Sequence, residues 1–141
     1  MSQPSDLALQ ALRGADSRLT PARRAVVEAL AARAHLTAPE VVEAVQAQAP
    51  EISRASVYRT LDLLTRLGIC QAATLGGPVV RYTLTPTGAH HHLVCSRCQR
   101  SFEFDTCGLT PLIPELEART GFRIHGHLLE AYGLCPDCQS A

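Results

Sequence analysis

Four cysteines in the last third of the chain have the spacing of metal ligands. They form two CxxC pairs, Cys95 with Cys98 and Cys135 with Cys138, with thirty-six residues between the pairs. Two residues between cysteines let both sulfurs face one point, and two such pairs supply the four thiolates of a closed tetrahedral zinc site. A closed site stabilises structure and leaves no position for catalysis. The pattern therefore predicts a structural Zn²⁺ ion.

Disulfides or unrelated buried thiols are the alternatives to zinc. Residues 1–13 lack the basic and then apolar regions of a secretory signal, so nothing points to an oxidising compartment.

Cys70 and Cys107 lie outside the pairs. Their plain interpretation is small buried hydrophobic residues; the alternatives are a redox-sensitive thiol or, for Cys107, a metal ligand near Glu103.

The composition fits a globular protein of one ordinary domain or two small ones. The chain has 141 residues, of which 46% are apolar. No run reaches the roughly eighteen apolar residues of a membrane span, so we expect a cytoplasmic protein with no membrane partner. The net charge of zero argues mildly against nucleic-acid binding, but residues 1–85 carry nine Arg against seven acidic residues.

The first half predicts a helical trio followed by a hairpin. A short helix over 7–13 comes first, and capping signals open three more, after Thr20, Thr37 and Ser53. Two β-prone runs, 69–75 and 79–84, flank Gly76-Gly77 and predict the hairpin. This order is typical of a winged helix-turn-helix.

The helix after Ser53 has two different faces. Val57, Leu61, Leu64 and Leu67 have the spacing of a buried stripe, and the opposite face is basic and carries a tyrosine. That face fits a DNA-recognition helix, although a solvated helix surface is the ordinary alternative. Its residues are Arg54, Tyr58, Arg59, Asp62 and Arg66.

The second half predicts a small α/β module. Residues 86–89 read as a hinge between a domain over 1–85 and a second over 90–141. We expect strands around Leu93-Val94 and 101–104, a helix capped by Thr110 and ended by Gly121, and a strand over 122–131. The whole chain is then α+β. The second module is small for independent stability, so we expect a homodimer, which also matches a palindromic DNA operator.

These residues together resemble the ferric uptake regulator (Fur) family of metal-responsive repressors over nearly the whole chain. The resemblance implies an N-terminal winged helix for double-stranded DNA, a C-terminal dimerisation domain, a structural zinc and a regulatory metal. It places Tyr58 and Arg59 in the major groove, with Arg54 and Ser56 on the same helix, and Arg18 at the minor groove or backbone. The stretches that carry it are 18–24, 35–38, 53–61, 90–98, Glu103-Phe104 and 132–138.

The resemblance assigns the regulatory metal to His35, His90, His92 and Glu103. On a strand His90 and His92 project to one face and His91 to the other. Because these ligands come from both sides of the hinge, metal binding would select the arrangement of the two domains that fits the operator. For a full switch, the metal must bind that arrangement more tightly than the inactive one by about 5 kcal/mol. Three imidazoles and a carboxylate suit Zn²⁺, although Fe²⁺ or Mn²⁺ with water also fits.

Several positions depart from the family pattern. Thr83 follows Tyr82 where many relatives have an acidic ligand. Relatives in the zinc-responsive branch often have an acidic or His ligand early in the wing and a Cys near its end, and this chain has Gln71 and Thr85 at those positions. A further family site would use His91 and His127, but Ala89 and Thr110 occupy its other ligand positions. His125 reads as a surface or core histidine.

The sequence therefore predicts a metal-dependent repressor of metal-uptake genes and not an enzyme. One alternative is a peroxide sensor of the same fold, in which bound Fe²⁺ oxidises a ligand histidine; relatives of that kind have Asp at the position of Glu103. A second is a zinc-dependent hydrolase that uses the three-His, one-Glu set. Against the hydrolase, no separate general base accompanies these ligands.

Overall fold

The protein is described here from a computed structural model that covers residues 3–15, 17–85, 91–104, 106–124, 127 and 129–140. The chain divides into two compact units. The first unit comprises residues 1–74 and 78–87, and the second comprises residues 75–77 and 88–141. None of the helices in the described ranges is long and apolar enough to cross a membrane.

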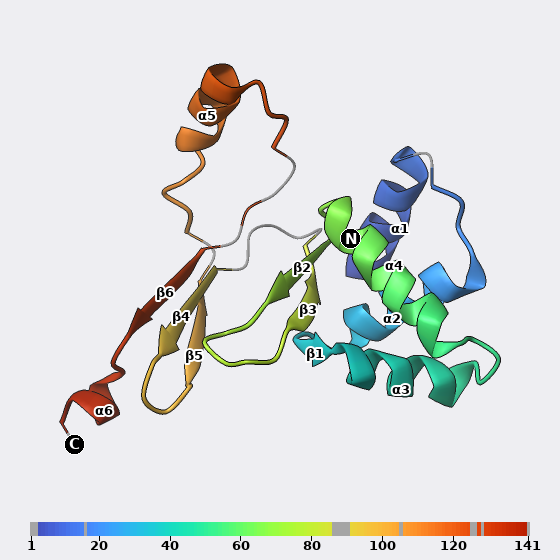
Figure 1. Ribbon diagram of the computed structural model, residues 1–141, viewed down its shortest axis with the longest axis horizontal. Coiled ribbons are helices and arrows are strands. Elements are labelled where there is room, and N and C mark those ends of the chain that lie inside the picture. The colour runs from blue at the N-terminus through green and yellow to red at the C-terminus, as the bar shows by residue number, and fades with distance from the viewer. Residues whose placement is uncertain are drawn as a thin grey trace. The chain divides into compact units, whose positions relative to one another are not determined.

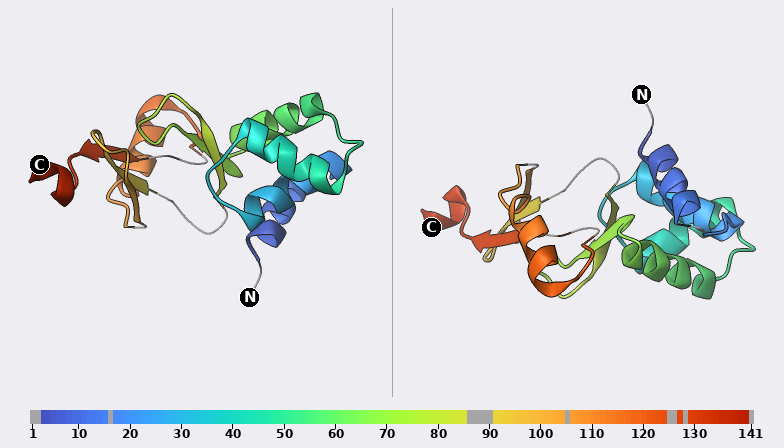
Figure 2. Two further views of the ribbon diagram at one scale, coloured as in Figure 1. Left: turned by 90° about the horizontal axis from the view of Figure 1, so that it is seen from below. Right: turned by 90° about the horizontal axis from the view of Figure 1, so that it is seen from above.

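The first unit consists of four helices and a three-stranded sheet of order β1-β3-β2. The helices α1–α4, blue to green in Figures 1 and 2, pack against one another. Both strand pairs are antiparallel, with Leu36 opposite Tyr82 and Cys70 opposite Leu84. The elements are α1 (Pro4–Gly14), α2 (Pro21–Ala32), β1 (Leu36–Thr37), α3 (Ala38–Gln48), α4 (Arg54–Arg66), β2 (Cys70–Ala73) and β3 (Arg81–Leu84).

The three predicted capping signals are confirmed. The hydroxyls of Thr20, Thr37 and Ser53 each accept a backbone N–H from the first turn of α2, α3 and α4. These helices bury one apolar stripe each, and burial of a Leu or Val side chain stabilises the fold by about 1.5–3 kcal/mol. The fully enclosed side chains include Leu12, Val26, Val27, Val41, Val45, Val57, Leu61 and Leu64.

The second unit has a three-stranded sheet of order β5-β4-β6, with β4 antiparallel to β5 and parallel to β6. Figure 1 shows α5 apart from the strands of this sheet. The unit's buried residues, within the described ranges, are His91, His92, Val94 and Cys95. The elements are β4 (His91–Cys95), β5 (Ser101–Phe104), α5 (Leu112–Thr120), β6 (Glu130–Gly133) and α6 (Pro136–Gln139).

The α+β fold class is confirmed, and two local predictions in the second unit are wrong. Thr110 does not cap α5: the N-cap is Pro111, which offers no side-chain acceptor. Residues 122–124 form no strand, and β6 begins only at Glu130, where the chain pairs with β4. The predicted hinge over 86–89 lies outside the described residues.

Candidate metal centres and nucleic-acid interface

The four cysteine sulfurs come together at one end of the second unit. Cys95 ends β4, Cys98 follows in the next turn, and Cys135 and Cys138 flank the start of α6. The four Sγ atoms all lie within 4.8 Å of one another, and Cys98 Sγ is 3.8 Å from Cys135 Sγ. Tetrahedral Zn²⁺ with Zn–S bonds of about 2.3 Å places its sulfurs about 3.8 Å apart, so the cluster fits zinc.

Hydrogen bonds join the two cysteine turns independently of any ion. Arg100 Nη1 lies 2.8 Å from Asp137 Oδ2, and Arg97 Nη1 donates to the Cys138 carbonyl at 2.6 Å. Backbone N–H groups, first that of Cys135, lower the pKa of the Cys95 thiol to about 5. Side-chain hydrogen bonds to the neighbouring thiols, first to that of Cys135, raise the pKa of the Cys138 thiol to about 12. Zn²⁺ binds thiolates, so metal binding at this cluster would release the thiol protons.

Two of the predicted regulatory ligands face each other across β4 and β5. His92 is directly opposite Glu103 in the strand register, and His92 Nε2 lies 3.6 Å from Glu103 Oε1. The His92 side chain is buried, whereas Glu103 is half-exposed. An imidazole and a carboxylate at this separation can share one cation. His90 lies outside the described residues.

His35 lies in the first unit, in the turn before β1, and Thr83 of β3 holds it. Its backbone N–H donates to Thr83 Oγ1 at 3.2 Å, and its ring Nδ1 lies 3.0 Å from the same oxygen. Its carbonyl accepts a hydrogen bond from Arg81 Nη1 at 3.1 Å. His35 also has a positive φ of 59°, which is uncommon for a residue with a side chain. Thr83, which stands where many relatives have an acidic ligand, thus contacts the predicted ligand His35.

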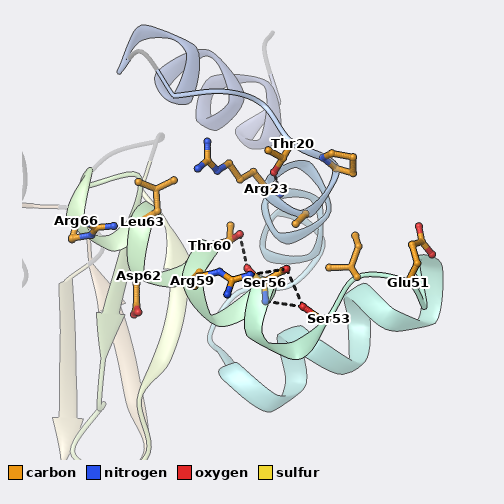
Figure 3. A pocket seen from close by; sticks show the side chains of 13 residues that line it. Thr20, Arg23, Glu51, Ser53, Ser56, Arg59, Thr60, Asp62, Leu63 and Arg66 are labelled. Carbon is orange, nitrogen blue, oxygen red and sulfur yellow. Dashed lines mark hydrogen bonds between the residues drawn. The ribbon is translucent and has the colours of Figure 1, made fainter.

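The predicted DNA-binding residues of α4 form one polar surface. Arg54 Nη2 donates to the Tyr58 hydroxyl at 3.3 Å, and its guanidinium carbon lies 5.5 Å from the centre of the Tyr58 ring. Arg59 Nη2 donates to Ser56 Oγ at 3.2 Å, drawn as a dashed line in Figure 3. Arg54, Tyr58 and Arg59 are exposed, as is Arg18 before α2.

Arg23 belongs to the same surface, although sequence reasoning omitted it. It lines a depression between the start of α2 and α4, together with Ser56 and Arg59 (Figure 3). Its guanidinium also donates a short hydrogen bond to the Arg18 carbonyl. The signal that could have found it is its place in the first turn after Thr20-Pro21, because a helix N-terminus with a neighbouring cation attracts phosphate.

His91 and His127, the residues of the predicted additional site, are brought together. Their rings stack with centroids 5.1 Å apart and an interplanar angle of 29°. Cys107 joins them, with Sγ 3.1 Å from His127 Nε2. Ala89 and His125 lie outside the described residues.

Comparisons with known proteins agree on one family. The sequence profile of the "Ferric uptake regulator family" matches residues 14–132. The Bacillus subtilis ferric uptake regulation protein is 38% identical over 132 residues, covering 90% of this chain and 89% of the relative. The peroxide operon regulator of the same organism is 34% identical over 133 residues, covering 93% and 90%. A zinc uptake regulator solved with zinc and DNA superposes with a TM-score of 0.62 at 25% identity, covering 99% and 97%. The chain is a member of the ferric uptake regulator family.

Proposed function

We propose that this protein is a metal-dependent, DNA-binding transcriptional repressor of genes for metal-ion uptake and homeostasis. The observation that carries the proposal is the division of α4 into two faces. Val57, Leu61 and Leu64 are buried, whereas Arg54, Tyr58 and Arg59 stay at the surface. Such a helix can enter the major groove, where Arg reads guanine through two hydrogen bonds. The family membership supports the same function.

The chain's own ligands support a structural Zn²⁺ and a separate regulatory metal. Cys95, Cys98, Cys135 and Cys138 would hold the structural ion, which crosslinks β4 to α6 when bound. The second unit buries few residues, so a crosslink of this kind can supply much of its folding free energy.

For the regulatory metal we carry over the family assignment of His35, His90, His92 and Glu103. The pairing of His92 with Glu103 and the fixed position of His35 beside Thr83 support it. Because His35 belongs to the first unit and His92 to the second, shared ligation would favour one orientation of the two units. Zn²⁺, Fe²⁺ and Mn²⁺ are each compatible with this donor set.

A homodimer on a palindromic operator is the proposed active form. The second unit leaves large apolar side chains uncovered: Phe102 is 66% exposed, Phe122 72% and Tyr132 56%. Exposed apolar side chains of this size commonly belong to an interface between subunits. A second copy would cover them, and its two-fold symmetry would match two half-sites. We place this complex in the cytoplasm, with DNA and no membrane as its partner, and assign no enzymatic activity to it.

The recognition helix is tested by operator binding of Arg59→Ala. If the Arg59 guanidinium reads a base, we expect Arg59→Ala to lose about 1–3 kcal/mol of the free energy of operator binding. Arg119→Ala is the matched control, because Arg119 is an exposed arginine of α5 whose Nη1 lies 3.6 Å from Glu115 Oε1. Equal affinities of the two variants in a titration with labelled operator would exclude this role for α4.

Peroxide sensing is a second candidate, favoured by the 34% identity to a peroxide operon regulator. In that case Fe²⁺ and peroxide would oxidise a ligand histidine and add one oxygen atom to it. Mass spectrometry of the peptides that contain His35, His90 or His92, after peroxide treatment in the presence of Fe²⁺, separates the two functions. Unmodified peptides would exclude peroxide sensing by oxidation of a ligand histidine.

A further inference from the structure

A second cluster of soft ligands lies in the second unit, apart from the four cysteines. His91 of β4, Cys107 between β5 and α5, and His127 before β6 each offer one ligand atom, and these atoms all lie within 4.8 Å of one another. The Cys107 Sγ to His127 Nε2 distance is 3.1 Å. Three segments far apart in sequence thus bring a thiol and two imidazoles to one point.

The cluster is partly shielded from water. His91 is fully buried, while Cys107 and His127 are intermediate in exposure. The ring of Phe104 packs against His91 with its centroid 5.5 Å away. A site with apolar packing on one side and an accessible thiol on the other can hold an ion and still admit it from solvent.

The cluster is distinct from the proposed regulatory ligands. His91 and His92 are neighbours on β4, and successive strand residues point to opposite faces of the sheet. His92 is opposite Glu103 in the register, whereas His91 is opposite Phe104. One strand therefore contributes a histidine to each of two separate groups.

We propose that Cys107 is a metal ligand and that, with His91 and His127, it forms a soft-donor site for Zn²⁺. A thiolate and two imidazoles are donors that zinc accepts in tetrahedral sites, with a fourth position for water. Mn²⁺ prefers oxygen ligands, so a sulfur in the set selects against it. This site goes beyond the proposed function, because Cys107 replaces ligands expected at positions where the chain has Ala89 and Thr110.

Ligation would anchor the chain on both sides of α5. Cys107 lies before the helix and His127 after it, and both approach His91 of the central strand β4. No side chain of α5 is buried within the described structure, so the packing of the helix contributes little to holding it in place. Zn²⁺ bound here would close the segment between Cys107 and His127 against the sheet, reducing its conformational freedom.

The site is tested by Co²⁺ titration of the full-length protein that retains its four-cysteine Zn²⁺, verified by elemental analysis of the same sample. A thiolate ligand gives a sulfur-to-cobalt charge-transfer band, which a site of imidazoles and carboxylate does not. We expect the band in the wild type and its loss in Cys107→Ser and His127→Ala. Cys70→Ser, a buried thiol of the first unit, and Glu103→Gln, at the regulatory set, should both keep it.

A measurement on the unaltered chain guards against a folding defect in the variants. Zn²⁺ should slow alkylation of Cys107 by iodoacetamide, read by peptide mass spectrometry, at least tenfold, whereas Mn²⁺ should leave it unchanged. The proposal is overturned by the absence of a band in the wild type, by a band that survives Cys107→Ser, or by an alkylation rate that does not respond to Zn²⁺. Unchanged metal-stimulated operator binding in Glu103→Gln with the band intact would count against the proposed regulatory ligands alone and leave this site standing.

Discussion

At the scale of single residues, Thr83 contacts a proposed metal ligand, His35, through its hydroxyl oxygen. The chain has a hydroxyl where the family pattern offers a carboxylate, and this hydroxyl contacts both the backbone N–H and the ring Nδ1 of His35. A hydrogen bond at Nδ1 orients an imidazole for metal binding through Nε2. We infer that Thr83 positions His35 without touching the ion.

Replacing Thr83 with Val should weaken regulatory metal binding, because Val keeps the branched shape and removes the hydroxyl. Loss of such an outer partner lowers metal affinity by about 10–100-fold. The measurement is a metal titration of operator binding, with Thr83→Ser as the variant that should behave like the wild type. Equal metal dependence of Thr83→Val and the wild type would show that His35 needs no such support.

Cys70 should be chemically inert in the folded protein. Its side chain is 2% exposed, and burial raises the pKa of its thiol to about 12. Thiolates are the reactive form, so alkylation at pH about 8 should spare Cys70 until urea unfolds the first unit. Peptide mass spectrometry after iodoacetamide treatment measures this. Rapid labelling of native Cys70 would instead favour the redox-sensitive interpretation.

At the scale of elements, the helix starts of the first unit could be predicted because their signals are local. Thr20, Thr37 and Ser53 each satisfy N–H groups only three residues away. Strand β1 could not be found, since Leu36 and Thr37 alone carry no pattern and depend on β3. The start of β6 was misplaced for the same reason: its pairing with β4 joins residues far apart in sequence.

The capping box of α3 should be sensitive to mutation and to acid. Thr37→Ala removes the N-cap and should cost about 1 kcal/mol of unfolding free energy. The backbone hydrogen bond from Thr37 is the largest effect that lowers the pKa of Glu40 below its ordinary 4.5. The stabilisation by the Glu40 carboxylate is therefore complete above that value and is lost as the pH falls through the lowered pKa.

Urea unfolding of the wild type and Glu40→Gln, followed by the helical circular-dichroism signal, measures the acid dependence. The wild type should be the more stable at neutral pH, and the difference should shrink toward zero below the lowered pKa of Glu40. A difference that stays constant across this range would mean that the Glu40 charge contributes nothing to the cap.

At the scale of the whole molecule, the sequence predicted two kinds of metal centre but not all of their partners. The CxxC spacing puts two sulfurs of each pair in place locally, so the four-cysteine cluster was foreseeable. The sequence offers Cys107 as a candidate ligand near Glu103, yet the fold brings its sulfur to His91 and His127. Such a convergence depends on the sheet order β5-β4-β6, which no local pattern encodes.

The two kinds of centre should respond differently to mutation. Cys95→Ser should release the structural Zn²⁺ and unfold the second unit, because that unit has few buried residues to hold it together. His92→Ala should keep the fold and lose metal-stimulated operator binding. Thermal melts and zinc content of the two purified variants provide the comparison, and equal melts would contradict the division into structural and regulatory sites.

Metal-dependent operator binding is tested most directly by the operator affinity of the protein that holds only its four-cysteine Zn²⁺, compared with the same protein after addition of Zn²⁺, Fe²⁺ or Mn²⁺ under anaerobic conditions. We predict that at least one of these metals tightens operator binding strongly, up to about 10⁴-fold for a complete switch, and that His92→Ala abolishes the gain. Equal affinity with and without added metal would contradict this prediction.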